Sequence, residues 1–134
     1  MKDPEKIKQV ADYWLKTAEN DLKVMDSLLR AGHYDYSLFF GHLCLEKLLK
    51  GLYVKINKTS PPFTHDLNKL AKESELDLDQ KQILFFEEVN RFNIEVRYPD
   101  YRFTFYKKCT PEFTRSSVKK IKECFNWLMS ILKS

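Results

Sequence analysis

Apolar residues recur at helical spacing along most of the sequence, and this period constrains the fold more than any other feature. Within residues 5–30 they lie three or four positions apart, as on one face of a helix. Within residues 35–56 they spread almost all round the helix, which is typical of a central, buried helix. Residues 79–96 and the segment after Pro111 repeat the one-sided pattern. The one-sided faces are Val10, Trp14, Ala18, Leu22, Met25 and Leu29; Phe85, Val89, Phe92 and Val96; and Val118, Ile121, Phe125, Leu128 and Leu132.

Capping and breaking residues set the ends of the first three predicted helices. Gly32 follows the last periodic residue of the first helix and is a natural stop. Asp35 is suited to cap the second helix. Residues 60–62, Ser-Pro-Pro, break the chain after the second helix. Thr64 is then expected to open a short helix that runs to about Glu73.

The second half of the sequence contains one predicted loop and one clear helix start. Pro99 disfavours helical geometry at Tyr98, so we expect a loop rich in Tyr and Phe from there to Cys109. Thr110 followed by Pro111 is typical of a helix start. No strand-like alternation persists for more than a few residues. The sequence therefore predicts an all-α, antiparallel helical bundle of about four long helices and one short helix, in a single domain spanning residues 1–134.

Composition and charge narrow the class of protein. The hydrophobic fraction of 43% and only three Gly indicate a folded chain with few helix breakers. The three cysteines have no metal-like spacing, no stretch is apolar enough to span a membrane, and the charged start predicts no signal peptide. We therefore expect a cytoplasmic protein without a metal or other cofactor.

The net charge of +4 is distributed unevenly. Residues 1–96 carry 14 Lys and Arg against 16 Asp and Glu, whereas residues 97–134 carry nine against three. A basic C-terminal third can attract phosphates, although a solvated helix face explains the same pattern.

Five short motifs occur in order across residues 12–130. The motifs are Trp14, Ala18, Asp21 and Leu22; Gly32 and Tyr34; Glu46, Lys47, Lys50 and Gly51; Thr64, His65, Asp66 and Leu67; and Arg97, Tyr98, Pro99 and Asp100. In this order they resemble the HEPN family. Each motif is weak by itself, but their common order makes the resemblance fairly specific.

This resemblance implies a homodimeric helical bundle of prokaryotic type that is often encoded beside a minimal nucleotidyltransferase. In some such toxin–antitoxin pairs the HEPN member cleaves RNA, using an Arg followed after four to six residues by a His. Such a pair can stabilise the charge on the phosphorane and move a proton. No histidine follows Arg91, Arg97 or Arg102 in this sequence, so the nuclease motif is absent.

Two groups of polar residues are candidates for a nucleotide- or phosphate-binding groove. Arg97, with Asn93 beside it, is suited to hold phosphate, and Tyr98 is available to stack on a base. The structural alternative is that Arg97 forms an ion pair with Glu46 or Asp100. The second group is a polar stripe on the second helix, whose members lie four positions apart. It consists of His42, Glu46 and Lys50, and a structural network there is an alternative to a catalytic set.

His65 and the aromatic segment also allow two interpretations each. His65 is either a ligand or proton donor, or part of a helix cap with a local hydrogen bond. The segment after Arg97 interleaves Tyr and Phe with basic residues, which suits stacking of single-stranded nucleic acid or packing over the core or across a homodimer. Tyr101 lies where the resemblance implies a nucleotidyl acceptor.

Three functional hypotheses follow. The first is a non-catalytic HEPN-type component that binds nucleotide or RNA and works with a minimal nucleotidyltransferase. The second is a metal-independent ribonuclease with a divergent site built from Arg97, Glu46, Lys50 and His65. The third is a purely structural homodimer.

Overall fold

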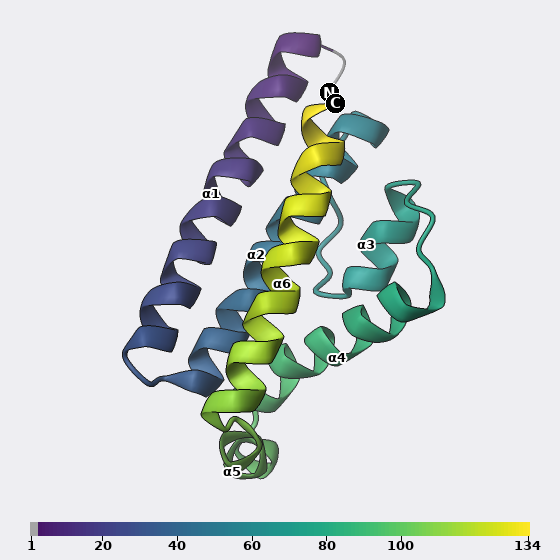
Figure 1. Ribbon diagram of the computed structural model, residues 1–134. Helices are drawn as coiled ribbons and strands as arrows, with labels where there is room; N and C mark the ends of the chain where they lie inside the picture. Colours follow the sequence, from purple (N-terminus) through teal and green to yellow (C-terminus); the bar gives the residue numbers. More distant parts are fainter. Residues whose placement is uncertain (1–2) are drawn as a thin grey trace.

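Six helices make up the secondary structure of residues 3–134, the part of the chain that the computed structural model describes (Figure 1). No strand occurs in this part, so the predicted all-α bundle is confirmed. None of these helices combines the length and apolar character needed to cross a membrane. The helices are α1 (Pro4–Arg30), α2 (Tyr34–Asn57), α3 (Leu67–Glu73), α4 (Gln80–Arg97), α5 (Pro99–Lys108) and α6 (Pro111–Lys133).

Helices α1 and α2 form an antiparallel hairpin around Gly32, which has a φ of +82°. In this conformation the Gly32 and His33 amides donate to the carbonyls of Leu29 and Leu28, so they satisfy groups that the end of α1 leaves free. An L-residue with a Cβ would be strained there. The predicted stop is therefore confirmed.

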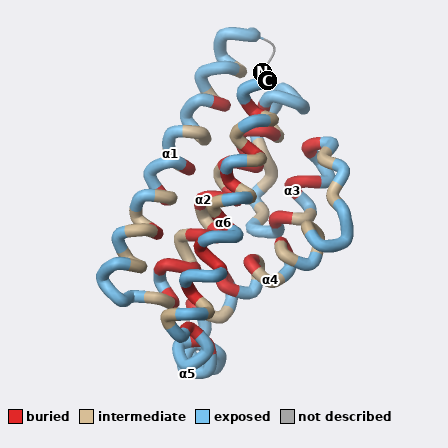
Figure 2. Tube along the Cα trace, in the orientation of Figure 1, coloured by how far each residue is buried: buried red, intermediate tan, exposed pale blue. Residues whose placement is uncertain are grey.

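Helix α2 is the central element, as its apolar pattern predicts. It packs against all five other helices, and buried positions occur on every side of it. Figure 2 shows the buried positions of the molecule concentrated along α2 and the inward faces of its neighbours. Gly41 permits this close packing, because a Cβ there would lie 2.5 Å from Ile121 Cδ1 and 3.2 Å from Met25 Sδ.

Two predicted helix starts are wrong. Helix α2 begins at Tyr34, one residue before Asp35, and no side chain caps it. The buried Asp35 carboxylate instead faces Arg102 of α5. Helix α3 begins at Leu67, with Asp66 as its cap, because the Asp66 carboxylate accepts from the two amides that follow Leu67. Thr64 lies outside the helix and accepts from the Asp66 amide at 3.2 Å.

The loop predicted after Tyr98 is also wrong, because Pro99–Lys108 form helix α5. Tyr98 is extended and ends α4, as its position before Pro99 requires. Pro99 then occupies the first position of a new helix, where its fixed φ and missing amide hydrogen cost nothing. Phe105 is the buried residue of α5 and packs against Phe92 of α4.

Candidate functional site

The sequence-predicted site residues separate into two groups. Glu46, Lys50, His65 and Asn93 lie with His42 in a polar cluster between α2, the segment before α3, and α4; we call these five residues the interior polar network. Arg97, Tyr98 and Tyr101 lie at the junction of α4 and α5 and are exposed. The structure therefore does not bring all the predicted residues into one groove.

Glu46 is the centre of the interior polar network. Its Oε2 accepts from Lys50 Nζ at 2.9 Å, and its Oε1 accepts from His65 Nδ1 at 2.8 Å. Only 6% of the Glu46 side chain is exposed, so both contacts offset the cost of burying its charge. Lys50 also lies 5.6 Å from the centre of the Trp14 ring of α1. The predicted polar stripe is thus a hydrogen-bonded network rather than an open groove.

His42 is completely buried, and its two ring nitrogens have different partners. Its Nε2 lies 2.8 Å from the backbone oxygen of His65, which can only accept, so Nε2 carries the hydrogen. Its Nδ1 then accepts from Asn93 Nδ2 at 3.2 Å. Burial lowers the pKa of His42 below 6.5, although Glu46 opposes the shift. A neutral imidazole with one fixed tautomer therefore joins α2 to α4 and to the segment before α3.

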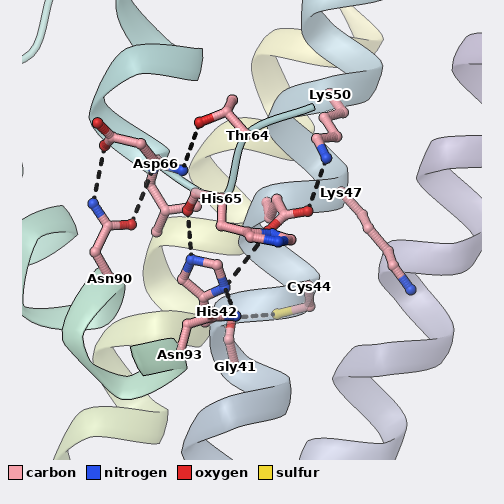
Figure 3. A network of polar contacts seen from close by, with 12 residues as sticks. Gly41, His42, Cys44, Lys47, Lys50, Thr64, His65, Asp66, Asn90 and Asn93 are labelled. Atoms are coloured by element: carbon pink, nitrogen blue, oxygen red, sulfur yellow. Dashed lines mark hydrogen bonds and ion pairs between the residues drawn. The ribbon is translucent and has the colours of Figure 1, made fainter. Parts of the chain in front are cut away.

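The contacts continue from this network to the cap of α3 (Figure 3). Asn90 of α4 donates to the Asp66 carboxylate and accepts from the Leu67 amide, both at 3.0 Å. Lys47 points away toward α1, where it pairs with Asp21 at 2.7 Å. The sequence pattern does not reveal this role of Asn90, because its partners lie 23 and 24 positions away along the chain.

His65 is the member of the network that reaches solvent. Its side chain is 55% exposed, whereas Glu46, to which it donates, is almost fully buried. With Nδ1 held by Glu46, the other ring nitrogen, Nε2, forms no hydrogen bond within residues 3–134. The alternative of a helix cap is wrong for His65 itself, because Asp66 performs that role.

Arg97 makes neither of the two ion pairs considered for it. No ion pair joins it to Glu46 or Asp100 in the part of the chain described; its guanidinium lies over the Phe39 ring, 5.6 Å from the centroid. Asn93, one turn earlier on the same face of α4, is buried and turned to His42. Arg97 itself is exposed, although Val96 beside it is still buried, so exposure changes within one turn of α4.

Helix α5 presents exposed aromatic side chains among cations. Tyr98, Tyr101, Phe103 and Tyr106 are each at least 55% exposed. Large exposed apolar patches often mark interaction sites, so this group is a candidate binding surface. We call the following residues the α5 surface: Arg97, Tyr98, Tyr101, Arg102, Phe103, Tyr106, Lys107 and Lys108.

A groove of about 630 Å³ lies between the α5 surface and the start of α2. Arg102 crosses it and hydrogen-bonds the Tyr36 hydroxyl, while its guanidinium lies 4.8 Å from the Tyr36 ring centre and 3.8 Å from Asp35. Phe103 and Tyr106 complete the walls. The groove thus offers aromatic faces and a cation that a buried carboxylate orients.

The cysteines do not add a nucleophile. Burial raises the pKa of Cys109 and of Cys124 to about 12, and it also raises the pKa of Cys44. Near neutral pH all three are thiols, which are weak nucleophiles and weak metal ligands. Within residues 3–134 no three His, Cys, Asp or Glu side chains are grouped to hold a metal ion.

Comparison with known proteins identifies the family. The sequence matches the HEPN domain over residues 11–132. The protein TT1696 from Thermus thermophilus has a similar structure, with a TM-score of 0.74 at 19% identity, covering 90% of this chain and 96% of that chain. The archaeal HEPN homologue ST0689 gives a TM-score of 0.72 at 21% identity, covering 91% and 97%. No curated protein sequence shows a significant match. The chain belongs to the HEPN domain family.

Proposed function

We propose that this chain is a non-catalytic, nucleotide- or RNA-binding component that works in the cytoplasm with a minimal nucleotidyltransferase, as in a prokaryotic toxin–antitoxin pair. The observation that supports binding is the α5 surface, where four exposed aromatic rings are interspersed with four cations. Aromatic faces stack on bases of any sequence, and the cations neutralise phosphates.

The non-catalytic half rests on the missing histidine and on the geometry around Arg97. No histidine follows Arg97 in the sequence. The ribonuclease alternative requires Arg97 to act with Glu46, Lys50 and His65, but Arg97 lies over Phe39 while the other three bond to one another. The geometry therefore favours binding over cleavage.

The RNA-binding test measures the affinity of a labelled single-stranded RNA by fluorescence anisotropy. Phe103→Ala removes a stacking face that is 66% exposed, and loss of one stacked base should weaken binding by about 1–3 kcal/mol. Tyr13→Ala is the matched control, since Tyr13 is 62% exposed but lies on α1. Equal effects of the two substitutions would eliminate the α5 surface as the RNA site. Cleavage of the RNA that Arg97→Ala abolishes would instead support the ribonuclease alternative.

The partner is tested separately. We expect the chain to co-elute with the nucleotidyltransferase of a neighbouring gene in size-exclusion chromatography of the two purified proteins. Tyr101 is 57% exposed and is the proposed acceptor of a nucleotidyl group in that complex. Intact-mass analysis after incubation with nucleoside triphosphate should show one added nucleotide, which Tyr101→Phe removes. Separate elution of the two proteins contradicts the partnership.

We also propose that the chain is a homodimer. A groove of about 750 Å³ between α4 and α6 supports this proposal, because Leu84 and Trp127 leave apolar surface there. Leu84 is 53% exposed. Sedimentation equilibrium should give a dimer that Leu84→Lys weakens, whereas a monomer at micromolar concentration contradicts the proposal.

A further inference from the structure

The hydrogen bond between His65 and Glu46 holds the segment before α3 against α2 and also fixes the orientation of the His65 ring. Glu46 Oε1 accepts from His65 Nδ1 at 2.8 Å, which fixes the hydrogen on Nδ1 and leaves the lone pair on Nε2. The imidazole is 55% exposed, and Nε2 has no hydrogen-bond partner within residues 3–134. The free nitrogen is therefore an accessible nucleophile with a fixed tautomer.

The other histidines lack this arrangement. His42 is completely buried, and both of its ring nitrogens are hydrogen-bonded. His33 is exposed, but no carboxylate accepts a hydrogen bond from it among the described residues. His65 is thus exposed and oriented, His33 is exposed but not oriented by a carboxylate, and His42 is inaccessible. The reactivity of His65 can therefore be compared with that of the other two histidines in the same chain.

The charges around His65 suit an anionic group. Lys50 Nζ lies 2.9 Å from Glu46 Oε2, so the carboxylate is neutralised at its other oxygen. The carboxylate that orients His65 is therefore paired, and the neighbouring Asp66 carboxylate is held by the Asn68 and Lys69 amides and by Asn90. When Nε2 forms a bond the ring becomes positive, and Glu46 stabilises that charge, as carboxylates do for reacting histidines.

Two other uses of the pair fit less well. A transition metal needs further ligands, and no group of three His, Cys, Asp or Glu side chains exists in residues 3–134. An organic substrate needs a pocket, and His65 lines neither the groove of about 630 Å³ nor the groove of about 750 Å³ described above. Transfer of a small group to an exposed nitrogen needs neither.

We propose that His65 is a phosphoryl-acceptor site, with Glu46 as its positioning residue; this inference goes beyond the proposed function and is independent of it. The donor is of the phosphoramidate class. The Nε2 lone pair attacks phosphorus, the bond from phosphorus to the donor nitrogen breaks, and that nitrogen leaves with its electron pair and takes a proton from water. The Nδ1 proton stays on the ring, bonded to Glu46.

The test treats the intact, folded chain with potassium phosphoramidate and follows each histidine by peptide mass spectrometry under conditions that preserve phosphohistidine. His65 should react at least about tenfold faster than His33, a difference in barrier of about 1.4 kcal/mol. Phosphorus-31 NMR should show the Nε2 isomer. His42 should not react, which confirms that the protein remains folded during the experiment.

Glu46→Gln tests the positioning role. The rate at His65 should fall to about the rate at His33, while the rate at His33 stays unchanged. If the variant unfolds, His42 becomes reactive and reports it, and the ratio of His65 to His33 in the unsubstituted chain still decides the proposal.

Three results would overturn the proposal. The first is a rate at His65 no greater than at His33, and the second is the Nδ1 isomer. The third comes from a parallel reaction with diethyl pyrocarbonate, an uncharged electrophile. Preference for His65 with that reagent but not with phosphoramidate would show a reactive imidazole that does not accept phosphoryl groups.

Discussion

Acidification tests the interior polar network through His42, which is completely buried between α2 and α4. In the folded chain the neutral imidazole donates through Nε2 to the His65 carbonyl and accepts through Nδ1 from Asn93. A second proton would break the contact to Asn93 and place a charge in the interior. Burial therefore lowers the pKa of His42 below 6.5, more strongly than the nearby Glu46 raises it.

The direction of the effect on stability follows from proton binding. As the pH falls below 6.5, the unfolded chain binds a proton at this position before the folded chain does. The free energy of unfolding therefore decreases with falling pH, by at most about 1.4 kcal/mol per pH unit for one group. The decrease ends below the pKa of the folded state, and the contribution is fully present above pH 6.5.

The assay is urea denaturation followed by circular dichroism at several pH values between about 7.5 and about 5. His42→Gln is the matched variant, because its amide can donate to the His65 carbonyl and accept from Asn93 but does not titrate. The slope of the unfolding free energy against pH should be smaller in the variant. Groups that do not interact with His42 are common to both proteins and cancel in the comparison. Identical slopes would refute the reasoning.

Three further substitutions test other parts of the fold. Glu46→Ala leaves Lys50 buried without its carboxylate and should lower the unfolding free energy by about 3–5 kcal/mol in urea denaturation. Gly32→Ala forces a Cβ into a φ of +82° and should cost about 1 kcal/mol or more, whereas Ala31→Gly next to it should cost less. Phe105→Ala removes the buried contact of α5 and should cost about 3 kcal/mol or more, with increased proteolysis confined to residues 98–110. Proteolysis elsewhere at the same rate would contradict this role of Phe105.

The long helices were predictable because each carries its own signal. The apolar period of α1 and α6 corresponds to one buried face in each, and the absence of such a face in α2 corresponds to its central position. Thr110 and Pro111 start α6 as predicted, with Thr110 accepting from the Phe113 amide. These signals are local, so the sequence alone is sufficient to read them.

Helix α5 could not be predicted in the same way. Its buried residue is Phe105 alone, so no periodic face exists to indicate a helix. Pro99 is compatible with both a loop and the first position of a helix. What stabilises α5 is the contact of Phe105 with Phe92 of α4, which depends on tertiary structure.

The candidate site was predictable only in part, for a related reason. The spacing of His42, Glu46 and Lys50 placed them on one side of α2, and the structure confirms that they lie together. Their partners come from segments far along the chain, and nothing in the local sequence ties His65 to Glu46. Arg97 shares a helix face with Asn93, yet one turn of α4 is enough to change a buried position into an exposed one.

That single turn of α4 connects the two groups of functional residues. Asn90 and Asn93 bond to Asp66 and His42 on the interior side, whereas Arg97 lies over Phe39, one turn before His42 on α2. The interface between α2 and α4 therefore changes from hydrogen bonds to a cation–aromatic contact within a short distance along both helices. Because polar contacts fix the C-terminal half of α4, the exposed aromatic side chains that begin at Tyr98 directly follow an anchored segment. Such preorganisation reduces the entropy lost on binding, which a mobile loop with the same residues could not do.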